Sequence, residues 1–128
     1  RSAMSKRINR KQSSTDMLVE LVLRVLDNLK AEAVVRFDVR HLTSVTDTMI
    51  IATGRSSRHV RAVAEAVVQE SKDEGHRTLG IEGVVGGEWA LIDLADVVVH
   101  VMLAKVRDFY ELEKLWNIDS LSDDEEFS

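Results

Sequence analysis

Apolar positions recur along the chain with two different spacings, and these spacings predict its helices and strands. Intervals of three and four residues predict a helix on the stripe Leu18, Leu21, Val22, Val25, Leu26 and Leu29. Ser14 or Thr15 is expected to cap the start of this helix. A second helix, with Ser56 or Ser57 as its cap and Gly75 at its end, is predicted on the stripe Val60, Val63, Ala64, Val67 and Val68.

Five further segments have the composition or the alternation of strands. They span residues 34–39, 46–53, 77–83, 87–94 and 96–103, and a last helix is predicted over residues 105–116. The strand–helix–strand part implies a right-handed parallel crossover, and the last two strands form an antiparallel hairpin. The order α-β-β-α-β-β-β-α therefore predicts an α+β fold: a mixed five-stranded sheet layered with helices that lie mostly on one face.

The hairpin at residues 87–103 mixes polar and apolar positions in an informative way. Trp89, Leu91 and Asp93 share one strand face by simple alternation. The next strand is apolar on both faces but begins at Asp96 and carries His100 in its middle. We therefore expect one face of the sheet to be sealed by helices and the other to present Trp89, His100 and carboxylates to a partner.

The composition is that of a single soluble domain. With 128 residues, of which 45% are hydrophobic and 30% charged, the chain is long enough for one core, and it contains no cysteine. It has neither the ~20-residue apolar run of a membrane span nor the pattern of a signal peptide. These features predict a cytoplasmic protein without disulfides or a thiolate metal site.

Charge is concentrated at the two ends of the chain. Residues 1–12 carry +5 and residues 119–128 carry −5, so the middle accounts for the whole net charge of −5. We predict a disordered basic arm over residues 1–15 (residues 1–3 resemble a cloning remnant), a folded domain over 16–117 and a disordered acidic tail over 118–128. An acidic domain is a poor general binder of nucleic acid and is better suited to a basic protein partner. The alternative interpretation is that the negative charge only keeps the protein soluble.

Two motifs raise the question of enzyme chemistry. Gly54 begins a turn before a helix N-terminus, where an anion can bind, but the glycines and lysine of a phosphate-binding loop are missing and capping explains the turn more simply. Asp93 and Asp96 flank a hairpin turn, where Asp serves either Mg²⁺ or the turn itself. His100 has the chemistry of a general base, but without a neighbouring nucleophile a hydrogen bond to a nearby carboxylate is the preferred interpretation. We predict no catalytic residue, metal or cofactor.

Aromatic and charged residues supply the candidates for a partner contact. Trp89 follows Gly-Gly-Glu at the mouth of a strand, a place that suits either the core or an interface. Arg58, His59 and Tyr110 are weaker contact candidates, and Asp96 and His100 complete the set. The sheet edge also permits pairing with a second copy, so a homodimer is a further hypothesis.

Several separated motifs together resemble the Iojap-related ribosomal silencing factor family, also called RsfS. They are TDTMIIATGRSSRHVRAVAEAVV (46–68), GIEG (80–83), WALIDLADVVVHVM (89–102) and RDFYELEKLW (107–116). The resemblance covers residues 16–117, and the motifs follow one another with matching spacing. Ala95 departs from it, because glycine is common at that position, and a small residue there is expected to be harmless.

The resemblance implies a translation repressor and not an enzyme. Members of the family bind the large ribosomal subunit at the fourteenth large-subunit ribosomal protein, on the face that meets the small subunit. They thereby block subunit association and lower protein synthesis when nutrients run short. The family's contact strand corresponds here to Trp89, Leu91 and Asp93, and we expect Asp93 and Asp96 to pair with Lys or Arg of the partner.

The competing hypothesis is a small nucleotide-binding or nucleotidyltransferase-like enzyme. It would use the Gly54 turn for phosphate and Asp93 with Asp96 for a metal ion. The resemblance implies a fold similar to that of nucleotidyltransferases, but the carboxylate pair that follows a Gly-Ser turn in metal-dependent nucleotidyl transfer has no counterpart here. This departure argues against catalysis.

Overall fold

The computed structural model describes the backbone of residues 3–40 and 46–110, and side chains within 14–40 and 46–108. Its elements follow one another in the predicted order. They are α1 (Ala3–Asn28), β1 (Glu32–Asp38), β2 (Thr48–Gly54), α2 (Ser57–Asp73), β3 (Gly80–Glu82), β4 (Trp89–Asp93), β5 (Val97–Leu103) and α3 (Ala104–Tyr110). The predicted α+β class and element order are confirmed.

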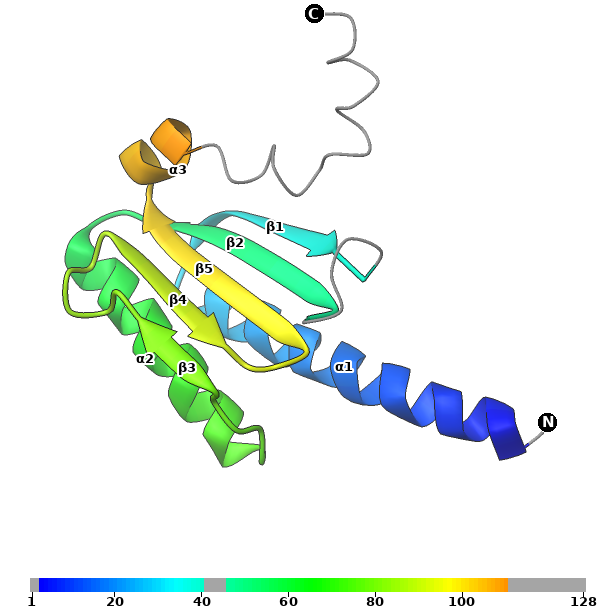
Figure 1. Cartoon of the computed structure of the whole chain (residues 1–128). Coiled ribbons are helices and arrows are strands. Elements are labelled where there is room, and N and C mark those ends of the chain that lie inside the picture. The colour runs from blue at the N-terminus through cyan, green and yellow to red at the C-terminus, as the bar shows by residue number, and fades with distance from the viewer. Residues whose placement is uncertain (1–2, 41–45, 111–128) are drawn as a thin grey trace, which may run out of the picture.

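The five strands form one mixed sheet in the order β1-β2-β5-β4-β3 (Figure 1). β2 and β5 are parallel, and the other three pairs of neighbours are antiparallel. β3 therefore runs in the same direction as β2, but β5 and β4 separate the two strands. All seven residues of β2 are buried, as expected for a strand with neighbours on both edges and side chains covered on both faces.

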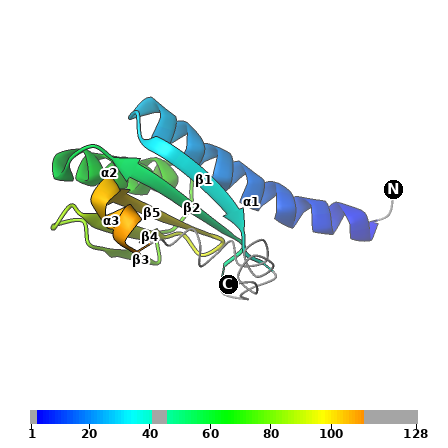
Figure 2. The ribbon, with the colours of Figure 1, turned by 90° about the horizontal axis from the view of Figure 1, so that it is seen from above.

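α1 and α2 pack side by side on one face of the sheet (Figure 2). The apolar stripes of both helices meet the residues of β2, β4 and β5 that alternate toward them. Burying each Val, Leu or Ile side chain among them contributes about 1.5–3 kcal/mol. The fully or almost fully buried members include Leu21, Val22, Leu26, Ile50, Val60, Val63, Val67, Ala90, Ile92, Val99 and Val101.

A second, smaller core lies on the opposite face of the sheet. Its buried members are Val39, Met49, Ile51 and Met102, and the partly buried residues packed against them are Phe37, Trp89 and Val106. Because Val106 belongs to α3, the last helix lies on the face that α1 and α2 leave uncovered. The predicted layering on mostly one face is confirmed, with this short helix as the exception.

The N-terminal helix is longer than predicted. α1 begins at Ala3, so the prediction that Ser14 or Thr15 caps its start is wrong, and both residues lie inside the helix. The structure is also helical over residues 3–15, which we predicted to be a disordered arm. This segment has no apolar stripe but is free of Gly and Pro and rich in Lys and Arg, which favour helix without tertiary packing.

The remaining boundaries differ by a few residues. β3 has three residues where residues 77–83 were predicted. Ser56 is the N-cap of α2, and Gly75, with a φ of 87°, follows its last turn, as predicted. The second half of the predicted last helix and the predicted acidic tail lie outside the described residues. Within the described part, no helix is both long and apolar enough to cross a membrane.

Candidate protein-docking face

β4 and β5 place the polar residues of the hairpin on the face of the sheet away from α1 and α2. Trp89, Leu91 and Asp93 stand opposite Met102, His100 and Val98 respectively. We call these six residues the outer face. Their neighbours in sequence, such as Ala90 and Ile92, point toward the helices and are fully buried. The predicted alternation is confirmed, and the three β4 residues of the outer face are half-buried.

The indole of Trp89 is hydrogen-bonded to the imidazole of His100. Trp89 Nε1–H donates to His100 Nδ1 over 2.9 Å, and the ring centroids are 5.9 Å apart with the planes tilted by 50°. The register explains the contact, since Trp89 is diagonal to His100 across the β4–β5 ladder, within reach of a large aromatic side chain. His100 therefore bonds an indole and not the carboxylate that the sequence suggested.

Burial and this hydrogen bond together define the state of His100. The side chain is 7% exposed, and burial lowers the pKa of His100 to about 4. Because Nδ1 accepts the indole hydrogen, the ring is neutral and its own proton is on Nε2. A neutral imidazole whose Nδ1 is already engaged is poorly suited to act as a general base there.

The turn between β4 and β5 accounts for Asp93. Its Oδ1 accepts a hydrogen bond of 2.9 Å from Ala95 N, which is a typical role of Asp in a turn. Asp96 N donates to Leu94 O over 3.0 Å, so Ala95 is the centre of a three-residue turn. The described part of the chain contains no group of three or more His, Asp or Glu side chains able to hold a metal ion. The arrangement agrees with turn formation and gives no support to a magnesium site.

Ala95 has a backbone conformation that alanine rarely adopts. Its φ is +75°, in the left-handed region that glycine enters without steric cost. We expected a small residue to be harmless here, and this stays a prediction; the positive φ indicates that a residue with a Cβ incurs a steric cost in this turn. At a positive φ, the presence or absence of a Cβ affects the backbone strain more than the size of the side chain does.

The loop before α2 is held together by its own side chains. Ser56 Oγ accepts from His59 N over 3.1 Å, and His59 Nδ1 accepts from Arg55 N over 2.9 Å. The other ring nitrogen, Nε2, lies 2.7 Å from Leu29 O, so His59 links the end of α1 to the start of α2. Both nitrogens of His59 serve the fold, whereas Arg58 is exposed. Two backbone N–H groups that an anion would use are already engaged, which favours the capping interpretation.

The two halves of the nucleotide hypothesis lie far apart. Gly54 is paired with Leu103 at one end of β5, whereas Asp93 is paired with Val98 near the other end. Five residues of strand separate these positions along β5, which corresponds to about 17 Å. A phosphate group at the Gly54 turn would not reach a metal ion at Asp93 and Asp96. Gly54 has a packing role instead, since a Cβ there would lie 2.6 Å from Val60 Cγ2.

Arg107 is a buried residue that the sequence analysis missed. It is 7% exposed, and its Nη1 donates to Ala33 O over 2.6 Å and to Thr53 Oγ1 over 2.8 Å. These bonds attach α3 to β1 and β2 at the margin of the outer face. Nothing in the sequence indicated them, because both acceptors are more than fifty positions away. Tyr110 ends α3, but its side chain lies outside the described ones.

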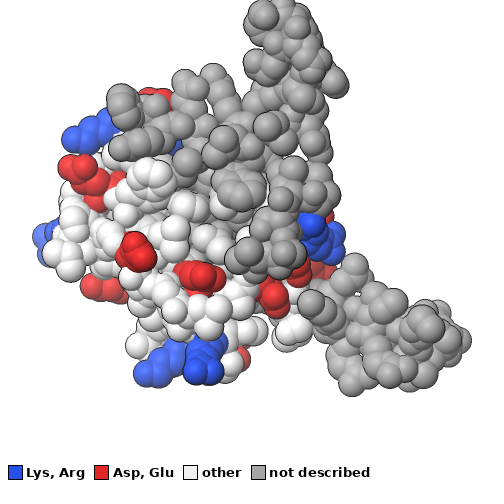
Figure 3. Space-filling model, viewed as in Figure 1, with Lys and Arg blue, Asp and Glu red and all other residues white. Residues whose placement is uncertain are grey.

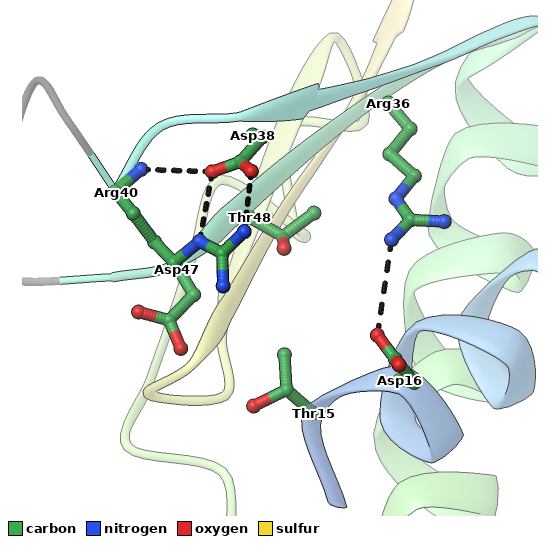
Figure 4. A pocket seen from close by; sticks show the side chains of 7 residues that line it. All are labelled: Thr15, Asp16, Arg36, Asp38, Arg40, Asp47 and Thr48. Atoms are coloured by element: carbon green, nitrogen blue, oxygen red, sulfur yellow. Dashed lines mark hydrogen bonds and ion pairs between the residues drawn. The ribbon is translucent and has the colours of Figure 1, made fainter. Parts of the chain in front are cut away.

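Two hollows lie away from the outer face. A polar one of about 260 Å³, between α1 and β1, is lined by Thr15, Asp16, Arg36, Asp38, Arg40, Asp47 and Thr48 (Figure 4). Its charges are largely paired with one another, Arg40 with Asp38 at 2.7 Å and Arg36 with Asp16 at 4.0 Å. An apolar groove of about 310 Å³ runs between α2 and β3 and is lined by Ala64, Glu65, Val68, Gln69, Ile81 and Val84.

The side of the molecule that carries the outer face is acidic in character. Figure 3, seen from that side, shows acidic side chains spread over the sheet and basic side chains mainly near its rim. Lys105 and Glu88 are near each other beside Trp89, with 4.0 Å between Nζ and Oε2. A half-buried Trp and Leu next to a carboxylate, on an acidic surface, is an arrangement that fits a basic protein partner.

Comparison with known families decides to which of them the chain is related. The family model described as "Ribosomal silencing factor during starvation" matches residues 11–128. The chain belongs to the RsfS family. The RsfS protein of Haemophilus influenzae is 46% identical over 99 residues, which cover 77% of this chain and 97% of the relative. The suspected resemblance is confirmed.

Solved structures of similar sequence share the fold. A crystal structure of a Chromobacterium violaceum protein has a TM-score of 0.78 and 42% identity, covering 80% of this chain and 85% of that one. A Bacillus halodurans structure has a TM-score of 0.73 and 36% identity, covering 79% and 94%. The fold described above is thus the fold of RsfS relatives, a family named for ribosomal silencing and not for a chemical reaction.

Proposed function

We propose that this chain binds the large ribosomal subunit through the fourteenth large-subunit ribosomal protein, on the intersubunit face, and sterically blocks association with the small subunit. Translation would then fall when nutrients are limiting. Membership of the RsfS family supports the general role. A mouse relative, 34% identical, is named for mitochondrial assembly of the ribosomal large subunit; the chain covers 47% of its length.

The observation that carries the proposal is the outer face. Trp89 and Leu91 are half-buried on an otherwise well-packed sheet, and Asp93 stands beside them on the same strand. Aromatic residues of this kind supply much of the binding energy in protein interfaces, while nearby acidic groups favour encounter with a basic surface. The proposed contact is therefore an apolar anchor of Trp89 and Leu91 surrounded by carboxylates that pair with Lys or Arg.

The other predicted contact residues differ in how accessible their side chains are to a partner. Asp96 lies half-buried in the β4–β5 turn and Arg58 is exposed at the start of α2, so both side chains are accessible to a partner. His59 is engaged within the chain, and we assign it a supporting role. We further propose a cytoplasmic location. That the chain forms a homodimer, and that its fold is similar to that of nucleotidyltransferases, both stay predictions.

The test is co-sedimentation with purified large and small ribosomal subunits at low and moderate salt. The expected result is pelleting with the large subunit alone that persists at moderate salt. Trp89→Ala should weaken this binding by about 2 kcal/mol, which is about thirtyfold. Val85→Ala is the matched control, because Val85 is 92% exposed and does not belong to the outer face.

Two further measurements distinguish an effect of Trp89→Ala on folding from an effect on function. Circular dichroism establishes whether Trp89→Ala keeps the fold, since Trp89 also packs against the second core. Light scattering of mixed subunits measures whether the protein lowers subunit association. Normal binding by a folded Trp89→Ala variant, or equal salt-sensitive pelleting with both subunits, would refute the proposal.

A further inference from the structure

His100 is too deeply buried to offer a partner much surface, yet it is hydrogen-bonded to Trp89, the largest side chain of the outer face. It is 7% exposed and stands between Ile51 of β2 and Leu91 of β4 in the sheet. Because its side chain is almost completely buried, the imidazole has little freedom to turn. Its Nδ1 is therefore a fixed acceptor, and the direction of that acceptor determines where the Trp89 indole can bond.

The indole of Trp89 is less enclosed than the imidazole of His100. Trp89 is half-buried at the first position of β4, directly after the glycine-rich turn that contains Gly86 and Gly87. Any freedom of a partly exposed indole to rotate about its side-chain torsions would be lost on binding, and this loss costs conformational entropy. The hydrogen bond to Nδ1 favours a single orientation, because any rotation of the indole away from His100 leaves a buried acceptor without its donor.

We propose that His100 is a positioning residue for the partner contact: its neutral Nδ1 holds the Trp89 indole in the binding orientation before the partner arrives. This inference rests on the proposed function. His100 then contributes to affinity by reducing the conformational freedom that Trp89 loses on binding, and it does so without touching the partner. The signature of such a role is that the effect of His100 exists only while Trp89 can donate a hydrogen bond.

The charged groups near His100 are engaged elsewhere. Asp93, two positions beyond Leu91 on the same face, bonds to Ala95 N in the turn. Arg107, on α3, donates to Ala33 O and Thr53 Oγ1. The hydrogen bond that His100 Nδ1 accepts comes instead from the uncharged indole of Trp89.

A double-mutant cycle tests this role. His100→Leu removes the acceptor, Trp89→Phe removes the donor while keeping an aromatic ring, and the double variant removes both. Binding of the full chain to large ribosomal subunits is measured by sedimentation titration at pH 7.5. We expect His100→Leu to weaken binding about threefold to tenfold. The same replacement should have no further effect in the Trp89→Phe background.

A conservative variant and a spectroscopic signal complete the design. His100→Asn places an amide oxygen near the position of Nδ1 and should restore affinity to within about twofold of the unmodified chain. The indole ¹H–¹⁵N signal of Trp89, distinguished from that of Trp116 with Trp116→Phe, should move and exchange with solvent faster in His100→Leu but not in His100→Asn. Neither spectroscopic readout involves the ribosome.

The possible outcomes are distinguishable. Unchanged affinity of a folded His100→Leu variant overturns the positioning role, as does an equal loss in the Trp89 and Trp89→Phe backgrounds. In both of these cases the proposed function stands, because the unmodified chain still binds. Failure of the unmodified chain to bind large subunits overturns the proposed function and, with it, this inference.

Discussion

The turn between β4 and β5 contains a strained alanine, and replacing it with glycine should stabilise the protein. Ala95 has a φ of +75° and donates its N–H to Asp93 Oδ1. Ala95→Gly removes the Cβ that makes this conformation costly and keeps the N–H and both hydrogen bonds of the turn. Since Ala95 is only half-buried, loss of its methyl group sacrifices little packing.

The expected gain follows from two opposing terms. A left-handed conformation costs an L-residue with a Cβ about 1–2 kcal/mol, and glycine is spared this cost. Glycine also has more freedom in the unfolded chain, which costs about 0.5–1 kcal/mol relative to alanine. The net stabilisation should be about 0.5–1 kcal/mol, which for a domain of this size raises the melting temperature by about 2–4 °C.

The assay is equilibrium unfolding in urea followed by circular dichroism, together with a thermal melt. Ala62→Gly is the matched control, because Ala62 is exposed inside α2, where the same replacement should destabilise by about 1 kcal/mol. The two variants make the same chemical change in backbones of opposite φ. If Ala95→Gly is no more stable than the unmodified chain while Ala62→Gly behaves as expected, the strain argument is refuted.

Two further predictions concern the surroundings of Trp89. The pKa of His100 is lowered to about 4 in the folded state and is near 6.5 when unfolded, so the unfolded chain binds the extra proton between these values. The stability that neutral His100 contributes is fully present above pH 6.5 and falls by about 3 kcal/mol as the pH is lowered toward 4. Urea unfolding at a series of pH values should therefore show a steeper loss of stability for the unmodified chain than for His100→Asn. Parallel losses in the two proteins would contradict the prediction. Gly83 has a φ of +79°, and a Cβ there would collide with Trp89 O, so Gly83→Ala should destabilise by about 1–3 kcal/mol in the same assay. Gly86→Ala, whose Cβ would approach nothing closer than 3.9 Å, should have a much smaller effect, and equal effects of the two would contradict the collision.

Most of the fold was predictable because each element carries its own local signal. The stripes of α1 and α2 and the alternation of β4 specify which side chains are buried, and Ser56 and Gly75 mark the ends of α2. The start of α1 was not predictable from the same signal, because residues 3–13 are helical without an apolar stripe. Intrinsic helix propensity, which is weak for each residue, is the property that favours helix there.

The central contact of the outer face depends on register, and the sequence leaves the register open. Alternation shows that Trp89 and Asp93 share a face, but which β5 residue stands beside Trp89 is set by the residues that form the turn. The turn is centred on Ala95, where no glycine marks the left-handed position, and a shift of the loop by one residue changes every pairing. The bond from Trp89 to His100 therefore became apparent only with the ladder in place.

The outer face derives its rigidity from both sides of the sheet. β5, which carries His100, is paired with β2 on one edge and β4 on the other, and its helix-facing residues Val99 and Val101 are fully buried. The absence of a Cβ at Gly83 leaves room for the carbonyl oxygen of Trp89, and His100 Nδ1 accepts a hydrogen bond from the Trp89 indole. A contact surface built in this way loses little conformational freedom on binding, so more of its apolar area contributes to affinity. Replacements that loosen this support should consequently weaken the partner contact even when they touch none of the surface that the partner meets.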